Sequence, residues 1–503
     1  MIIIQPGNIN SYTSSAIVIG AGFAGLSAAC HLAKAGVKVT VLEKQATPGG
    51  RAAQLKADGF VFDMGPSWYW MPDVFDNFFA KFGKKTSDYY SIKRLDPSYR
   101  IYWPDEHTDL PANLQQMRDL FESIEKGSAA NLDVFLEEAE YKYRVGMQKL
   151  VYKPGLSLLE FADMDVVKGA FRLDLLTSME KHVDKLFKHP KLRQMLKFPV
   201  LFLGATAKDT PALYSLMNYA DIVGGTWYPE GGMYSIVEAM YALALELGVE
   251  FRFDEEVIGI KVIDKIIESV VSKKNTYKAD HVIGAADYHH IEQKLLPDAY
   301  RSYTESYWQS RSLAPSCLLY YVGLNKKLEG IQHHSLFFDS DFDQHAAEIY
   351  TDPSWPADPL FYVCASSVTD PKAAPDGHEN LFFLIPVAAG LENDTESIRA
   401  KYFDQVLTRF EKRTGQKIRD SIVFKKSFAY SDFVSNYHSF RGNAYGLANT
   451  LRQTAILKPS CKSKKITNLF YAGQLTVPGP GVPPSLVSGE VVATLILKKI
   501  AGR

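Results

Sequence analysis

Hydrophobic residues follow two spacings along the chain, and the change from one to the other predicts where strands and helices lie. Near the N-terminus, residues 15–19 (SAIVI) form a β-branched run that is typical of a buried parallel strand. Between Leu26 and Gly36, apolar side chains recur at helical spacing, and Gly36 suits the end of a helix. A further apolar run at residues 37–42 predicts another strand. The order strand, helix, strand indicates an α/β domain with a parallel sheet.

The rest of the chain divides into helical and extended stretches. Residues 110–225 carry apolar side chains at three-to-four spacing, which predicts a mainly helical segment. Residues 296–450 alternate strand-like runs with polar turns and include a helix near 395–413, which is typical of an antiparallel sheet. Four further strands are predicted at residues 249–253, 256–263, 280–285 and 468–473, and a helix is predicted at residues 486–500.

Composition and charge exclude several classes of protein. Of the 503 residues, 46% are hydrophobic and 22% are charged, which is typical of a globular protein with more than one core. The formal net charge of −1 leaves no basic excess for binding nucleic acid, so we predict no nucleic-acid partner. The four cysteines are widely separated, and no lysine or arginine precedes Lys34. We therefore expect a cytoplasmic protein without disulfides, a zinc site or a membrane span.

The first candidate site joins the N-terminal strand to its helix through Gly20, Ala21, Gly22 and Gly25. Glycines at these positions permit a tight turn, let a pyrophosphate approach the backbone and let the helix pack on the strand, and the free amides of the helix bind the anion. Glu43 follows the second strand, at the spacing of a carboxylate that binds ribose hydroxyls. An acid at this position argues against a 2′-phosphate, so the pattern predicts FAD or NAD. The alternative is a glycine-rich structural turn.

Further motifs favour FAD over NAD. Residues suited to approach an extended cofactor follow Glu43 and recur near the C-terminus: Gly50, Arg51, Gly65, Pro66, Ser67, Gly473, Gly481 and Val482. A simple nicotinamide enzyme has no need of so many contacts, and a plain turn is the alternative for Gly49-Gly50. We therefore predict one cofactor domain built from both ends of the chain.

With these motifs in place, the sequence resembles the phytoene-desaturase family of carotenoid desaturases, within the amine-oxidase-like flavoproteins. The resemblance covers about residues 16–501, and its more specific parts are residues 228–233 (YPEGGM), 319–325 (LYYVGLN), 333–334 (HH) and 478–482 (PGPGV). It implies an FAD-dependent enzyme that removes hydrogens from phytoene toward lycopene by hydride transfer to the flavin. It also implies that the backbone at Val257 holds the adenine.

The same resemblance implies a hydrophobic carotenoid substrate, peripheral attachment to a membrane surface, and oxygen or a quinone as electron acceptor. Carotenoid 3,4-desaturation, ζ-carotene desaturation and cis–trans isomerisation are alternatives on the same scaffold. An amine oxidase and a non-enzymatic escort of prenylated proteins are more distant ones. Some relatives carry Asp-Met-x-Arg in the central region, and Asp163-Met164-Asp165-Val166 keeps the acid. Asp163 is therefore the candidate proton acceptor, and a plain surface aspartate is the alternative.

The predicted fold class is α/β: a Rossmann-type FAD-binding domain from both chain ends, with an α+β substrate domain that has an antiparallel sheet and a helical cap. The expected division is residues 13–85, 227–295 and 456–503 for the FAD-binding domain, 86–226 for a helical membrane- or substrate-facing segment, and 296–455 for the substrate domain.

Two further patterns have competing interpretations. Residues 60–103 are rich in aromatic side chains, which either fill a core or form walls around a polyene. The pairs His289-His290 and His333-His334 suggest a metal site, but adjacent residues on a strand face opposite ways. We therefore predict no metal site.

Overall fold

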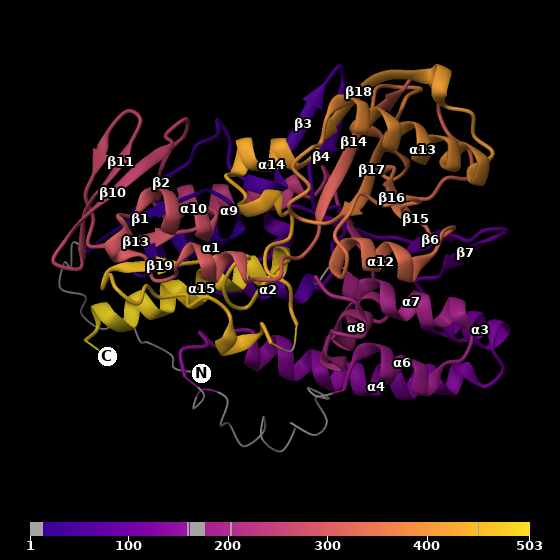
Figure 1. Ribbon diagram of the computed structural model, residues 1–503, viewed down its shortest axis with the longest axis horizontal. Helices are drawn as coiled ribbons and strands as arrows, with labels where there is room; N and C mark the ends of the chain where they lie inside the picture. Colours follow the sequence, from indigo (N-terminus) through magenta and orange to yellow (C-terminus); the bar gives the residue numbers. More distant parts are fainter. Residues whose placement is uncertain (1–13, 158–159, 161–176, 202–203, 451, 503) are drawn as a thin grey trace.

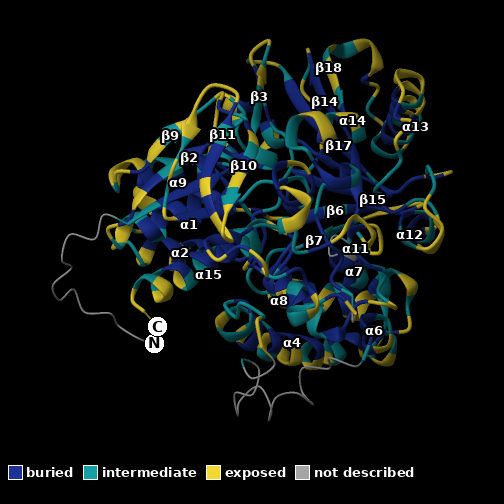
Figure 2. Ribbon diagram, turned by 60° about the vertical axis from the view of Figure 1, so that its left-hand side comes forward, coloured by how far each residue is buried: buried dark blue, intermediate teal, exposed yellow. Residues whose placement is uncertain are grey.

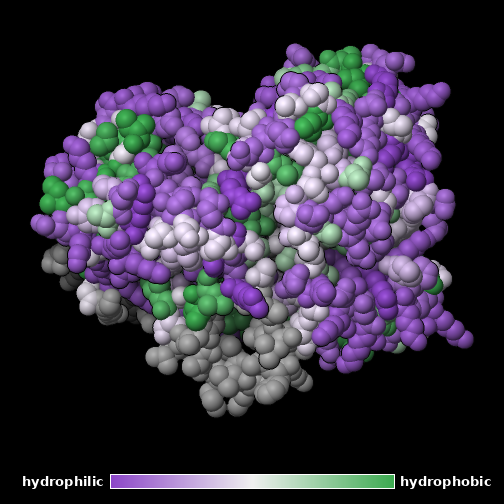
Figure 3. Space-filling model, in the orientation of Figure 1, coloured by the Kyte–Doolittle hydropathy of each residue, from purple (hydrophilic) through white to green (hydrophobic). Residues whose placement is uncertain are grey.

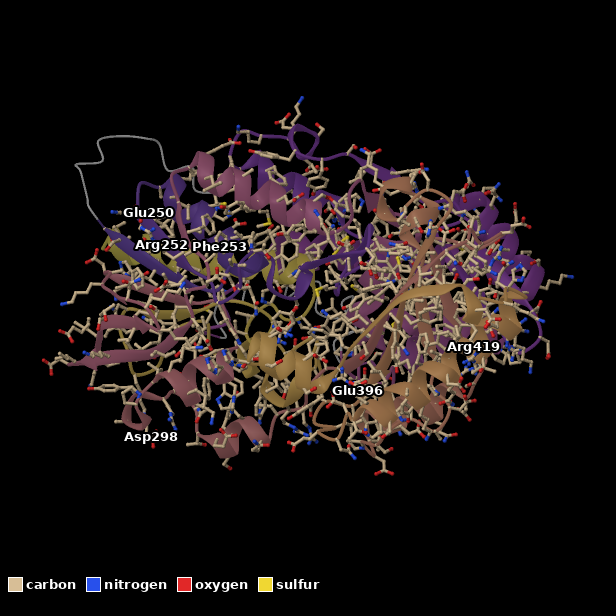
Figure 4. The ribbon with its side chains drawn as sticks, turned by 90° about the horizontal axis from the view of Figure 1, so that it is seen from above. Glu250, Arg252, Phe253, Asp298, Glu396 and Arg419 are labelled. Atoms are coloured by element: carbon tan, nitrogen blue, oxygen red, sulfur yellow. The ribbon has the colours of Figure 1, made fainter. Side chains whose placement is uncertain are left out.

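A computed structural model describes residues 14–157, 160, 177–201, 204–450 and 452–502. Its strands form two large sheets, which lie toward opposite ends of the molecule (Figure 1). Figure 4 shows this separation from above, with Glu250 and Arg252 of the first sheet on the left and Arg419, which precedes a strand of the second sheet, on the right. Figure 2 shows that buried residues dominate the strands of both sheets.

The first sheet is parallel and has the strand order β19-β13-β1-β2-β9. Its strands are β1 (Ser15–Ile19), β2 (Lys38–Leu42), β9 (Glu250–Arg252), β13 (His281–Gly284) and β19 (Leu469–Tyr471). Ile17 pairs with Thr40 on one side and with Val282 on the other, and Val282 pairs with Leu469. The two ends and the middle of the chain therefore share one sheet, as the sequence predicts.

Three helices pack beside this sheet: α1 (Phe23–Lys34), α9 (Tyr234–Glu246) and α15 (Val482–Ile500). Helix α1 contacts both α9 and α15. A Cβ on Gly489 of α15 would lie 2.3 Å from the Ala24 carbonyl oxygen of α1, so the two backbones are in direct contact. Helix α15 begins four residues before the predicted start, because Pro483 and Pro484 fit a first helical turn.

Smaller antiparallel units flank the parallel sheet. One is a three-stranded sheet, and two are strand pairs; their strands are β10 (Val257–Ile263), β11 (Ile266–Ser272), β12 (Thr276–Tyr277), β3 (Gln54–Ala57), β4 (Phe60–Asp63), β5 (Ile92–Arg94) and β8 (Trp227–Pro229).

The second sheet has seven strands in the order β18-β14-β17-β16-β15-β6-β7. They are β18 (Ile422–Phe428), β14 (Ser316–Leu324), β17 (Glu379–Val387), β16 (Phe361–Cys364), β15 (His334–Phe337), β6 (Tyr99–Tyr102) and β7 (His107–Leu110). A hydrophobic core lies between this sheet and α13 (Glu396–Thr414), which confirms the helix predicted near 395–413.

The second sheet differs from the prediction in two ways. It is mixed rather than purely antiparallel, because β15 and β6 are parallel. Strands β6 and β7 belong to residues 86–226, a segment expected to be helical. Strand β6 pairs with β15, which lies more than 230 residues away, so this pairing leaves no local pattern in the sequence. The division into domains therefore remains a proposal.

The helical group begins at residue 114 and packs below the second sheet (Figure 1). Its elements are α3 (Leu114–Ile124), α4 (Ser128–Val145), the π-helical turn η3 (Gly146–Leu150), α6 (Met179–Leu186), α7 (Pro190–Leu201), the 3₁₀ turn η5 (Ala212–Ser215) and α8 (Leu216–Ile222). The Asn113 side chain caps α3 by accepting from two backbone amides.

Other helices connect these units: α2 (Pro72–Ala80), α10 (Tyr288–His290), α11 (Glu305–Gln309), α12 (Phe342–Tyr350) and α14 (Tyr430–Tyr437). Among the described residues, no helix combines the length and the apolar character needed to cross a membrane.

Candidate functional site

A cavity of about 830 Å³ lies where the parallel sheet, the second sheet and the helical group meet. Most of the predicted cofactor residues line it: Gly20, Gly22, Glu43, Gly50, Arg51, Gly65, Pro66, Ser67, Val257, Gly473, Gly481 and Val482. The motifs from the two chain ends therefore face the same space.

The two remaining residues of that set, Ala21 and Gly25, support the turn from behind the cavity wall. The Ala21 amide donates to Glu43 Oε2 at 2.7 Å. A Cβ on Gly25 would lie 2.0 Å from the Gly20 carbonyl oxygen, so only glycine allows this approach of helix to turn. Both residues thus shape the site without facing it.

Glu43 places a buried carboxylate in the cavity wall. Its Oε1 accepts from the Gln45 amide at 2.9 Å, in addition to the bond from Ala21. Burial raises the pKa of Glu43, and the backbone amides act in the opposite direction. A carboxylate fixed in this way can accept further hydrogen bonds from the hydroxyls of a ribose.

Two helix N-termini point into the same cavity. Helix α1 begins after Gly22 and α15 after Gly481, and neither first turn is capped by a side chain. The positive end of a helix with free amides binds phosphate groups. The N-terminus of α1 therefore fits the phosphates of a dinucleotide, whereas Pro483 and Pro484 leave α15 fewer free amides.

Arg51 adds a partly buried cation at the cavity wall. Its Nη2 donates to Ser439 Oγ at 3.0 Å and lies 3.9 Å from Asp287 Oδ2. Its Nε has no hydrogen-bond partner within the described part of the chain. Burial lowers the pKa of Arg51, and the Asp287 carboxylate counteracts this effect. The sequence did not indicate Ser439 or Asp287, because both lie more than 230 residues from Arg51.

Asp63 holds a second turn at the site. Its carboxylate accepts from the amides of Met233 at 2.7 Å and Tyr234 at 3.1 Å, where α9 begins. Burial raises the pKa of Asp63 to about 7. The available signal for Asp63 in the sequence was its place two residues before Gly65.

The other side of the cavity is apolar. Trp68, Trp70 and Phe75 of the aromatic-rich stretch line it, whereas Phe78 and Phe79 lie in the core. Part of the aromatic-rich stretch therefore lines the cavity, and part of it fills the core. The helical group supplies further apolar walls: Met147, Leu150, Val151, Leu213, Leu216 and Met217. The π-helical turn contributes two of these, and such turns are frequent at functional sites. A long apolar molecule can therefore lie beside the cofactor.

A chain of hydrogen-bonded side chains leads from the second sheet to the cavity. The Tyr362 hydroxyl donates to Ser67 Oγ at 2.9 Å and lies 2.6 Å from His334 Nδ1. The His334 ring stacks on Trp68, with ring centroids 4.1 Å apart. Ser67 and Tyr362 are thus fixed polar groups in a largely apolar wall.

The argument from strand alternation is wrong for both histidine pairs. His333 precedes strand β15, so its ring lies only 4.4 Å from that of His334, and His289-His290 lies in helix α10. Ligand-capable atoms of His333, His334 and Cys364 all lie within 4.8 Å of one another. His333 Nδ1 is bonded to Thr369 Oγ1 at 2.7 Å, and burial lowers the pKa of His333 to about 3. The absence of a metal site stays a prediction.

The candidate proton acceptor Asp163 lies outside the described residues. Its role stays a hypothesis based on the resemblance alone.

Comparison with known proteins identifies the family. Residues 23–497 match the family model for flavin containing amine oxidoreductases. The chain is 43% identical to a carotenoid 3,4-desaturase of Haloarcula japonica, over 96% of this chain and 98% of the relative. It is 30% identical to a ζ-carotene-forming phytoene desaturase of Myxococcus xanthus, over 96% and 93% of the two chains.

Solved structures show the same fold at low identity. An oxidoreductase from Methanosarcina mazei aligns with a TM-score of 0.62 at 15% identity, covering 96% of this chain and 100% of that one. A putrescine oxidase aligns with a TM-score of 0.62 at 14% identity, covering 97% and 99%. The chain therefore belongs to the flavin-containing amine oxidoreductases and, among them, to the carotenoid desaturases, whose FAD the cavity is built to hold.

Proposed function

We propose that this FAD-dependent carotenoid desaturase introduces a double bond at the 3,4-position of a carotenoid. The observation that carries the proposal is one continuous cavity with cofactor motifs on one side and aromatic and aliphatic walls on the other. The choice of position is supported by the 43% identity to the Haloarcula japonica 3,4-desaturase over nearly the full length of both chains.

The chain would act mainly by binding and orienting its substrate. When bound, FAD supplies the group that accepts a hydride from a carbon of the polyene. Trp68, Trp70 and Leu319 would hold the polyene and exclude water, so that positioning supplies much of the rate. The hydroxyls of Ser67 and Tyr362 would fix the polar edge of the reacting region, and Asp163 remains the proposed acceptor of the proton lost from the neighbouring carbon.

We further propose that the protein binds a membrane surface beside the cavity. Lys153 and Ala455 line the cavity, and nearby Leu156 and Leu457 are 45% and 49% exposed. Figure 3 shows a mostly hydrophilic face with a few hydrophobic groups, one of them near its lower edge. Exposed leucines at a cavity mouth suit transfer of a lipid-soluble substrate. Oxygen or a membrane quinone would then reoxidise the flavin.

The phytoene-to-lycopene series is the second candidate. It is favoured by the Myxococcus xanthus relative and by a 4,4′-diapophytoene desaturase of Staphylococcus aureus that is 29% identical over 96% of this chain. The two candidates differ in the substrate they require: a colourless polyene for the series, and an already conjugated carotene for 3,4-desaturation.

The test is incubation of purified protein and FAD with liposomes that contain either phytoene or lycopene, followed by chromatography and mass spectrometry. A product two hydrogens lighter from lycopene alone supports 3,4-desaturation. Coloured products from phytoene support the second candidate, and an unchanged mass with altered retention indicates isomerisation. Protein without FAD is the control. If neither carotenoid changes while FAD is bound, the proposal is rejected.

A further inference from the structure

Lys458 is a buried amine beside the C-terminal glycine–proline loop. Only 4% of its surface is exposed, and its Nζ has no hydrogen-bond partner among the residues that the structure describes. Burial lowers the pKa of Lys458 to about 7. Burying an ammonium group without a hydrogen-bond partner costs free energy. A negative charge or a hydrogen-bond acceptor bound beside Lys458 would reduce that cost.

Asn449 is a second incomplete group at the same place. It lines the cavity and is 4% exposed, and its Oδ1 also has no partner within the described ranges. A Cβ on Gly479 would lie 3.0 Å from both Lys458 Nζ and Asn449 Oδ1. The two groups therefore flank one glycine, and its neighbours Pro478 and Pro480 line the cavity. In the described structure, an unpartnered donor and an unpartnered acceptor therefore lie beside one stretch of the cavity wall, and Asn449 is the one of the two that lines it.

The start of helix α15 lies in the same loop. Gly481 is its N-cap, and Pro483 and Pro484 occupy the first turn, so Val482 supplies the one free amide before Ser485, whose amide bonds to the Gly481 carbonyl. An ordinary helix start offers several amides to an anion. The Nζ of Lys458 lies beside Gly479, two residues before the N-cap, and can supply positive charge where the prolines leave no amide donors.

We propose that Lys458 and Asn449 form a subsite for the polar edge of the flavin ring, in which Lys458 favours the reduced cofactor and Asn449 accepts from the ring N–H. When a carbon–hydrogen bond of the substrate breaks, its electron pair and hydrogen pass to the flavin as hydride. The neighbouring carbon releases a proton, and a double bond forms between the two carbons. Bound FAD would take up both electrons and one negative charge, and Lys458, beside Gly479, would balance that charge.

The inference rests on the FAD cofactor and not on the identity of the carotenoid, so its test needs no substrate. Purified holoprotein is titrated with xanthine and xanthine oxidase in the presence of a reference dye, and flavin absorbance reports the ratio of reduced to oxidised cofactor. Lys458→Met should shift this equilibrium at least tenfold toward the oxidised form, about 30 mV for a two-electron couple. Lys458→Arg keeps the charge and should restore the equilibrium to within threefold of the wild type.

Two further variants make the comparison specific. Lys462→Met removes an exposed lysine four residues away and should leave the equilibrium unchanged. Asn449→Leu removes the acceptor and should weaken FAD binding, measured by flavin fluorescence, at least fivefold. The inference is overturned if Lys458→Met retains FAD and has the wild-type equilibrium. If that variant loses FAD, Lys458→Gln takes its place: an equilibrium shifted toward oxidised flavin supports the inference, and a wild-type equilibrium overturns it.

Discussion

At the scale of single residues, Asp221 makes the stability of the protein depend on pH. This carboxyl group is buried and accepts from the Tyr99 hydroxyl at 2.7 Å and from Thr226 Oγ1 at 3.0 Å. Burial raises its pKa to about 7, well above the ordinary value of about 4 for an unfolded chain. Between these pH values the native protein holds a proton that the unfolded chain has released. Its contribution to stability is therefore full below about pH 4 and is lost as pH rises to about 7.

Buried histidines whose pKa is lowered to about 3, such as His31 and His333, act in the opposite direction, so the contribution of Asp221 is measured as a difference between two proteins. Asp221→Asn keeps the shape of the side chain but cannot ionise, so in urea titrations we expect the free energy of unfolding of the wild type to fall relative to that of the variant between pH 5 and pH 7.5. Asp63, whose pKa is also raised to about 7, contributes in the same direction and leaves a residual slope in the variant. Equal slopes in the two proteins would contradict the assignment.

Glu43 should control the affinity for FAD. Glu43→Gln keeps the size of the side chain and removes the charge from a group placed to accept from a ribose. Hydrogen bonds to charged groups contribute about 1.5–3 kcal/mol, so we expect FAD to bind about 10- to 100-fold more weakly. Flavin fluorescence measures the dissociation constant, and the melting temperature of the apoprotein serves as the folding control. An unchanged dissociation constant would remove Glu43 from the site.

The sequence predicted Arg51 and Glu43 as polar groups of the site, and both line the cavity. It could not predict the groups that orient Arg51, because Ser439 lies 388 residues away and follows no recognisable motif. Local glycine turns have a sequence signature, whereas a contact between distant loops depends on the complete fold.

At the scale of elements, the contact between α1 and α15 depends on Gly489. In an isolated helix, alanine is favoured over glycine by about 1 kcal/mol. Here a Cβ would lie 2.3 Å from the Ala24 carbonyl and 2.7 Å from the Ala28 amide nitrogen. We therefore expect Gly489→Ala to destabilise the protein by about 1–3 kcal/mol, although helix propensity alone would make alanine stabilising.

The variant should also lose FAD during purification, because the N-termini of both helices face the cavity. Gly259→Ala is the matched control, since a Cβ there meets no other atom within 4 Å. Thermal melting and the flavin-to-protein absorbance ratio give the two readouts. A Gly489→Ala protein as stable as the wild type would show that the helices can separate without cost.

Elements were predictable where one strand or helix carries its own pattern. The β-branched run at residues 15–19 became β1 with the same bounds, because a buried parallel strand needs only apolar side chains. Strands β6 and β7 were missed because they are short, and because β6 gains its place by pairing with β15. Helix α15 was predicted four residues too short, since its prolines resembled a loop.

At the scale of the whole molecule, FAD should stabilise the folded chain by joining segments from both ends. A ligand that binds only the native state at 100 times its dissociation constant adds about 2.7 kcal/mol. We expect FAD to raise the melting temperature and riboflavin to raise it much less, because riboflavin lacks the part that Glu43 and α1 would hold. Differential scanning fluorimetry of the apoprotein tests this, and equal shifts would contradict it.

The order of strands in the parallel sheet also affects how the protein is made. Edge strand β19 and helix α15 come from residues 469–500, whereas the central strand β1 comes from residues 15–19. During synthesis on a ribosome, the first glycine turn emerges hundreds of residues before the strand and helix that complete its pocket. A nascent chain therefore carries an open half-site until residues 469–500 have been synthesised, and loading with its nucleotide must wait for them.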